Sequence, residues 1–155
     1  MKTSQNEALS LLTFNIANYT FGVDVGNVIS IMEYRKINKS LDFPKYILGS
    51  INVRNCEVPI FDLPKRLNIK KISEHKKNQS IILFHTKNNL DYNITGGIVD
   101  SINDVIHLKY NSNLNNFPDL ILQEITYNSQ VIKIINTKKI LELNLKKNIL
   151  LEEMH

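Results

Sequence analysis

The most informative stretch of this sequence reads Pro44-Lys-Tyr-Ile-Leu-Gly-Ser-Ile-Asn-Val-Arg-Asn-Cys-Glu-Val-Pro-Ile-Phe-Asp-Leu63. Its apolar run over 46–53, polar tip over 54–57 and returning apolar run over 58–61 are typical of two strands around a tight turn. Asn55 suits the tip because asparagine tolerates a positive φ better than most residues do. The stretch therefore predicts a β-hairpin.

Arg54 is the unusual residue of this hairpin, because it places a charge next to a turn between apolar strands. No acidic residue lies at an obvious pairing distance from it in the sequence. A charge held at a rigid hairpin tip more often serves a partner than the core. The alternative interpretation is that Arg54 is a solubilising turn residue.

The second strand of the hairpin carries two further signals. Pro59 cannot donate a hydrogen bond to a neighbouring strand, so we expect it at a sheet edge or among the first residues of a strand. Asp62 is expected to cap a short helical turn that runs through Leu67.

Length and composition limit the class of protein. With 155 residues, 43% of them hydrophobic and 22% charged, the chain suits one compact domain that can bury a core. No apolar run approaches the length of a membrane helix, and residues 1–7 lack the apolar core of a signal peptide. The single cysteine, Cys56, excludes an internal disulfide and fits a reducing cytoplasm. The net charge of +4 is compatible with contact to nucleic acid or a membrane surface.

The rest of the chain predicts further short strands. We expect residues 1–9 to be frayed, and residues 70–79 to link two halves that share an order of elements. The expected strands and strand pairs are 11–16 with 19–23, 29–35, 80–85 with 92–99, and 120–125 with 130–135. Asp24 is expected to cap a single helical turn over 25–28. A short helical turn leading into a strand is expected over 100–108, and Thr137 is expected to cap a C-terminal helix.

Four segments in order resemble the CheW family, the adaptor proteins of bacterial chemotaxis. In the first half the motif residues are Phe21-Gly-Val-Asp-Val25 with Val28, followed by Pro44, Gly49, Asn52-Val-Arg-Asn55 and Val58-Pro-Ile-Phe-Asp-Leu63. In the second half they are Gly97-Ile-Val-Asp100 with Val105 and Leu108, followed by the Pro-acidic turn at Asn115-Asn-Phe-Pro-Asp-Leu120. The family's usual glycine after the arginine is Asn55 here. The resemblance covers roughly Leu11 to Leu141.

The resemblance implies a mainly β fold of two packed five-stranded SH3-like β-barrels, with short helices and a C-terminal helix. It implies a flexible N-terminus over 1–9, one CheW-like domain over 10–145 with its linker near 70–79, and a tail or helix end over 146–155.

The resemblance also implies a non-enzymatic scaffold without a catalytic site, metal or cofactor. Such a protein couples the cytoplasmic tips of chemoreceptors, the methyl-accepting chemotaxis proteins, to the regulatory domain of the histidine kinase CheA. Other CheW-like domains are further implied partners, in rings. The implied location is the cytoplasm, at membrane-associated receptor arrays, with no nucleic acid bound and no direct insertion into the membrane.

The family motifs map onto two groups of candidate binding residues. The receptor-binding candidates are Val28, Ser30, Gly49, Asn52 and Arg54, and the kinase-binding candidates are Asn115, Asp119 and Leu120. The family has Glu at the position of Ser30 and often a basic residue at that of Asn115, and the segment over 118–130 is shorter than usual. These changes should alter partner choice more than fold. Val28 and Ser30 could also be ordinary strand residues, and Gly49 could serve backbone geometry alone.

Two rival functions make different demands on the residues. A hydrolase would need Asp62, Asp100 and a histidine in one pocket, and Cys56 as a nucleophile would need a base nearby. The four histidines show no ligand spacing, which argues against a metal site. A small-barrel nucleic-acid binder would need exposed aromatics among basic residues on one sheet face. The aromatics Tyr19, Phe21, Tyr34, Tyr46 and Phe61 are spread over several strands, and we expect most of them in the core.

Overall fold

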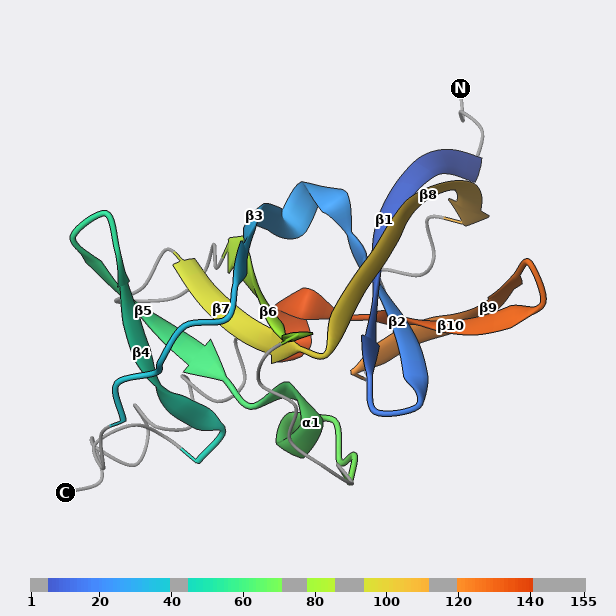
Figure 1. Ribbon diagram of the computed structural model, residues 1–155. Helices are drawn as coiled ribbons and strands as arrows, with labels where there is room; N and C mark the ends of the chain where they lie inside the picture. The colour runs from blue at the N-terminus through green and yellow to red at the C-terminus, as the bar shows by residue number, and fades with distance from the viewer. Residues whose placement is uncertain (1–5, 40–44, 71–77, 86–93, 112–119, 141–155) are drawn as a thin grey trace, which may run out of the picture.

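The computed structural model describes residues 6–39, 45–70, 78–85, 94–111 and 120–140, which form two five-stranded sheets (Figure 1). The strand orders are β8-β1-β2-β10-β9 in the first sheet and β3-β6-β7-β5-β4 in the second. The predicted mainly β fold of two five-stranded units is confirmed. The elements are β1 Asn6–Ile16, β2 Tyr19–Asp24, η1 Val25–Asn27, β3 Val28–Glu33, β4 Ile47–Val53, β5 Cys56–Phe61, α1 Leu63–Arg66, β6 Ser80–His85, β7 Ile94–Val99, β8 Ser101–Asn111, β9 Ile121–Tyr127 and β10 Gln130–Ile135.

The predicted hairpin is formed by β4 and β5, which pair antiparallel with Val53 opposite Cys56. Its tip is shorter than expected, because residues 56 and 57 already pair with β4. Only Arg54 and Asn55 form the turn, with φ of 50° and 66°. Two successive left-handed residues match the twist of the flanking strands, which makes this connection tight and rigid.

Pro59 lies neither on an edge strand nor among the first residues of its strand, the two places that the sequence suggested, because β5 begins at Cys56 and lies between β4 and β7. Because proline has no backbone N–H to donate, it needs a position where one neighbouring strand does not pair with it, and β5 provides such a position. Pro59 pairs with Ser50 of β4, whereas the parallel pairing of β5 with β7 includes only Ile60 and Phe61. The proline is therefore paired on one side only.

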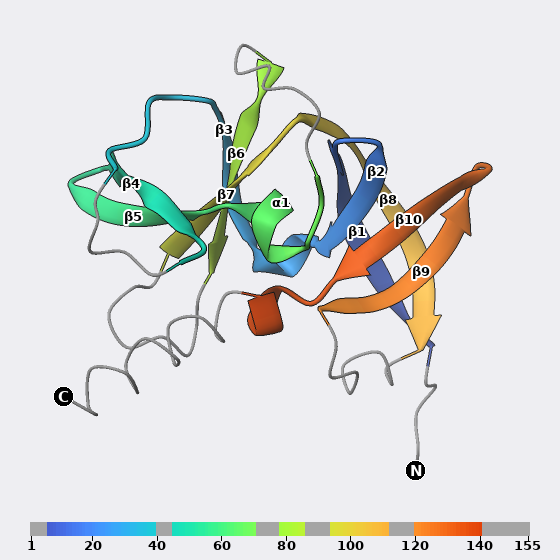
Figure 2. The ribbon, with the colours of Figure 1, turned by 90° about the horizontal axis from the view of Figure 1, so that it is seen from below.

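The two sheets are not successive halves of the chain. The segment over 70–79 joins two halves that share an order of elements, but the strands on either side of it, β5 and β6, belong to the same sheet. The first sheet takes β1 and β2 from the start of the chain and β8, β9 and β10 from its end. Figure 2 shows the two sheets side by side, with α1 and a helical turn over 137–140 near their junction.

An internal repeat explains why each sheet combines strands from both halves of the chain. β4, the two-residue turn, β5 and α1 recur as β9, a two-residue turn, β10 and the helical turn over 137–140, with strands of 7 and 6 residues in both copies. The turn at Asn128–Ser129 again has two positive φ angles. In each copy the residue that begins the helical turn, Asp62 or Asn136, accepts a hydrogen bond from the amide of the third residue after it, at 3.2 and 3.1 Å. The third strands of the two copies, β3 and β8, each pair in the sheet that holds the other copy's first hairpin.

Three local expectations need correction and two are confirmed. Residues 6–9 belong to β1 and pair with β8, and β8 is a continuous strand without a helical turn, although its pairing register with β1 shifts between Leu12 and Phe14. Asn136 rather than Thr137 caps the last helical turn. The expected caps at Asp24 and Asp62 are confirmed, because each side chain accepts a hydrogen bond from the first turn that follows it.

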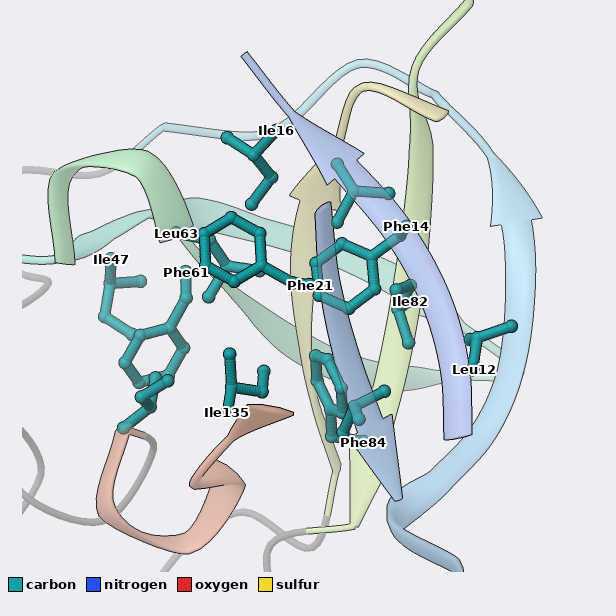
Figure 3. Packing of buried hydrophobic residues seen from close by; sticks show 13 residues of the cluster. Leu12, Phe14, Ile16, Phe21, Ile47, Phe61, Leu63, Ile82, Phe84 and Ile135 are labelled. Carbon is teal, nitrogen blue, oxygen red and sulfur yellow. The ribbon is translucent and has the colours of Figure 1, made fainter. Parts of the chain in front are cut away.

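The main core lies where the two sheets meet (Figure 3). Strand β6 shows how this arises from sequence, since its run over 81–84 is apolar on both faces. Ile82 and Phe84 point to the core between the sheets, whereas Ile81 and Leu83 point to a second cluster within their own sheet. Phe14 and Phe21 stack across the first hairpin with ring centres 5.9 Å apart. The main cluster comprises Leu12, Phe14, Ile16, Phe21, Val23, Ile47, Phe61, Leu63, Ile82, Phe84, Val99, Ile135 and Ile140.

Candidate functional site

Strand β3 is an edge strand that exposes apolar side chains. A bulge lies between Val28 and Ser30 in its pairing with β6. Val28 is half-buried against the main core, and Ser30 is exposed. Ile29 and Ile31, which flank Ser30, expose 38% and 43% of their surface. Two exposed isoleucines on an edge strand are costly in water, and such residues commonly mark a contact surface.

The two isoleucines were not among the predicted binding residues, although the sequence held a signal for them. Apart from Ser30, the run over 28–32 is apolar on both faces, like the run over 81–84 in β6. In β6 both faces are covered, because the strand is central in its sheet and packs against the other sheet. In β3 no described element covers Ile29 and Ile31, so the same pattern gives exposed apolar groups.

The tip of the β4–β5 hairpin carries Asn52 and Arg54, both exposed. Within the described residues Arg54 has no ion pair. The nearest acid along the hairpin, Glu57, instead accepts a hydrogen bond of 2.8 Å from the Ser50 hydroxyl. The charge of Arg54 is therefore open to a partner.

Gly49 is buried and holds the site together without facing solvent. The segment after β3 crosses β4 here, where Asn38 and Ser50 exchange two backbone hydrogen bonds of 2.8 and 2.9 Å. A Cβ on Gly49 would overlap the Asn38 carbonyl and lie 2.8 Å from Cγ2 of Ile37. Among the interpretations of Gly49, the structure favours backbone geometry over direct contact with a partner.

The kinase-binding candidates are placed only in part, since Asn115 and Asp119 lie outside the described residues. The carbonyl of Leu120 accepts a hydrogen bond of 2.7 Å from the Asn136 amide, and its half-buried side chain packs on the main core. Leu120 thus has a structural role in positioning the last helical turn, and its binding role stays a prediction.

We define the β3–β4 surface as the exposed residues Ile29, Ser30 and Ile31 of one edge strand and Asn52 and Arg54 at the hairpin of the other. It combines two apolar groups, a small hydroxyl, an amide and a guanidinium that has no ion pair among the described residues. Such a set can bind an apolar protein segment and fix its register through a charge.

The residues of the proposed hydrolase do not come together in the described part of the chain. Asp62 caps α1, whereas Asp100 accepts hydrogen bonds from the Ala17 amide and the Gln79 side chain. His107 pairs with the Ser10 hydroxyl at 2.8 Å. Among the described residues there is no group of three or more His, Cys, Asp or Glu side chains that could hold a metal ion. His75 and His155 lie outside them.

The aromatic residues do not form the platform that a nucleic-acid binder needs. Phe21 and Phe61 are buried, and Tyr34 and Tyr46 are half-buried. Tyr19 alone of these five rings is well exposed, with Lys133 Nζ 4.9 Å from its centre. Lys133 is also paired with Glu124 at 3.5 Å, which reduces its availability to phosphate.

One basic residue close to the junction is partly desolvated. Arg66 of α1 lies over the Tyr46 ring, 5.3 Å from its centre. Burial lowers the pKa of this guanidinium, and the neighbouring Tyr46 opposes that shift. Its Nε and Nη2 atoms are buried without a hydrogen-bond partner.

The family model of the CheW-like domain matches residues 10–143. The chain belongs to the CheW-like domain family. The resemblance found in the sequence is thereby confirmed over nearly all of the described chain.

Curated relatives agree with this membership. The chain is 29% identical to the chemotaxis protein CheW of Klebsiella aerogenes over 97 residues, which are 63% of this chain and 55% of that protein. It is 31% identical to the chemotaxis protein CheW of Bacillus subtilis over 96 residues, 62% of this chain and 58% of that one. The matched part thus spans little more than half of these CheW proteins.

A solved CheW structure has the same fold. The crystal structure of the scaffolding protein TtCheW from Thermoanaerobacter tengcongensis superimposes with a TM-score of 0.72 at 24% identity. The match covers 89% of this chain and 95% of that one. Within this CheW-like fold none of the described helices is long and apolar enough to cross a bilayer.

Proposed function

We propose that this protein is a non-enzymatic chemotaxis scaffold that couples chemoreceptor tips to the regulatory domain of CheA. Family membership and the names of the relatives support this role. It acts in the cytoplasm at membrane-associated receptor arrays, beside other CheW-like domains in rings. Weak contacts repeated across such an array become strong through effective concentration.

The observation that carries the proposal is the exposure of Ile29 and Ile31 on an edge strand. Burying an isoleucine against a partner contributes about 1.5–3 kcal/mol, which is enough to anchor a helix in a groove. Arg54 lies on the hairpin of the same sheet and has no ion pair among the described residues. The receptor tip therefore docks on the β3–β4 surface, with the isoleucines as anchors and Arg54 as the polar contact that sets register.

Two family departures bear on the partner's identity. Ser30 replaces a carboxylate, so this surface carries more positive charge than a family member with Glu at this position. Asn115 stands where a basic residue is common. Both changes favour a receptor or kinase whose contact residues differ in charge from the usual ones.

The test is a pull-down with two probes, the cytoplasmic tip of the cognate chemoreceptor and the C-terminal domain of CheA. We expect both probes to be retained at micromolar concentrations. Arg54→Glu should sharply reduce retention of the receptor tip while leaving the circular-dichroism melt unchanged. If neither probe binds the wild-type protein, the scaffold role is refuted. Retention of single-stranded oligonucleotides in place of both probes would favour the alternative of a nucleic-acid-binding barrel.

A further inference from the structure

A hydrogen bond joins the two edges of the second sheet close to the hairpin tip. Nη1 of Arg35 donates to the carbonyl oxygen of Asn52 at 2.8 Å. Arg35 is the second residue after the edge strand β3, whereas Asn52 lies near the end of β4, the opposite edge strand. The contact thus connects the strand that carries Ile29 and Ile31 to the hairpin that carries Arg54.

This bond is the outermost of three that fix the crossing. The other two are the backbone bonds between Asn38 and Ser50, which lie deeper in the sheet. Beyond Asn52 only Val53 precedes the turn, and the turn itself has two left-handed residues. The end of β4 is held on one side by its pairing with β5 and on the other by the Arg35 bond. The direction of the Arg54 side chain therefore depends in part on Arg35.

The internal repeat supplies a comparison within the same molecule. The two-residue turns of the copies begin at Arg54 and Asn128, so the same shift takes Asn52 to Thr126 and Arg35 to Lys109. Arg35 lies just after β3, whereas Lys109 lies within β8. No hydrogen bond joins Lys109 to Thr126 in the described part of the chain. The side-chain link is thus specific to the copy whose hairpin tip carries an arginine.

We propose that Arg35 is a positioning residue, which holds the end of β4 so that Arg54 meets the docked partner in a fixed direction. This inference rests on the proposed function, because it assigns Arg54 a contact with the receptor tip. Arginine suits the task, since its charged donor forms a stronger hydrogen bond to a carbonyl than a neutral donor does.

A double-mutant cycle with Arg54 tests the proposal. Titration calorimetry of the full chain with the cognate receptor tip is carried out for wild type, Arg35→Ala, Arg54→Ala and the double variant. We expect Arg35→Ala to weaken binding roughly three- to tenfold in the wild-type background and to have no further effect beside Arg54→Ala. Arg35→Lys should restore much of the loss, because its ammonium can still donate to Asn52. Lys109→Ala at the equivalent position is the matched control and should leave affinity unchanged.

A second readout needs no partner. Amide hydrogen exchange of residues 53–56 should accelerate in Arg35→Ala and stay near wild type in Arg35→Lys and Lys109→Ala. Equal losses from Arg35→Ala in both backgrounds, or unchanged exchange at the tip, would overturn the positioning role. If wild type does not bind the receptor tip, the proposed function fails, whereas the exchange experiment still decides whether Arg35 holds the hairpin.

Discussion

The side-chain amide of Gln79 donates a hydrogen bond of 3.2 Å to the Asp100 carboxylate at the junction of the two sheets. The second oxygen of Asp100 accepts a bond of 2.7 Å from the amide of Ala17, a residue held at a φ of 56°. One carboxylate thus ties the first turn of one sheet to the start of β6 in the other.

Loss of this carboxylate should destabilise the fold. We expect Asp100→Ala to lower the free energy of unfolding by about 1–3 kcal/mol, because the partly buried Ala17 amide loses its acceptor. Asp100→Asn keeps one acceptor oxygen and should cost less. Urea denaturation measures both, and equal effects of the two variants would contradict the assigned hydrogen bonds.

The exposed isoleucines should matter for binding and not for stability. Ile31→Asp should reduce retention of the receptor tip at least tenfold, because burying an isoleucine contributes about 1.5–3 kcal/mol. Its melting temperature should stay near that of wild type, since the side chain is exposed in the free protein. Val131→Asp is the matched control, as Val131 is 52% exposed on β10, away from the β3–β4 surface. Equal losses in both variants would argue against a specific docking surface.

Gly49 should tolerate no side chain. Gly49→Ala places a Cβ against the backbone of Asn38, which cannot rotate away as a flexible side chain could. We expect a loss of about 1–3 kcal/mol in urea denaturation, the usual cost of overpacking. Gly26→Ala is the control, because a Cβ there would meet only Asp24, at 3.4 Å. A Gly49→Ala protein as stable as wild type would refute the close crossing of Asn38 over β4.

Arg66 offers a substitution that should stabilise. Two of its buried nitrogen atoms lack hydrogen-bond partners, at a cost of about 1–3 kcal/mol. Its position over the Tyr46 ring returns only about 0.5–1 kcal/mol. Arg66→Met keeps most of the packing volume and should raise the melting temperature slightly, as measured by calorimetry. A clear drop in the melting temperature would show that the attraction of the Arg66 cation to the Tyr46 ring outweighs the cost of its buried nitrogen atoms.

Local patterns predicted the strands of this protein better than their arrangement. The hairpins and the caps at Asp24 and Asp62 follow from residues close together in the chain, such as Asn55 with its tolerance of positive φ. The exchange of β3 and β8 between the sheets could not be read in this way. It depends on contacts between distant residues, such as Thr13 with the carbonyl of Asp104, and no local propensity encodes that choice.

The candidate site was predicted in part for the same reason. Motif matching selected Ser30, Asn52 and Arg54, which the structure places at the surface, but also Gly49, which is buried. It missed Ile29 and Ile31. A strand with two apolar faces can be central or at an edge of its sheet, and only the topology of the whole fold decides which. Arg35 was missed because its role depends on a hydrogen bond across the sheet.

The exchange of β3 and β8 between the sheets has a consequence for how this protein folds. The first sheet cannot gain its β8 edge until most of the chain has been synthesised, because β8 begins at Ser101 and pairs back to β1. Such late, long-range pairing gives a high contact order and predicts slow folding, on the scale of roughly milliseconds to seconds. It also leaves one edge of β1 unpaired on the nascent chain, so the period before β8 has emerged from the ribosome is the stage at which this protein is most exposed to aggregation.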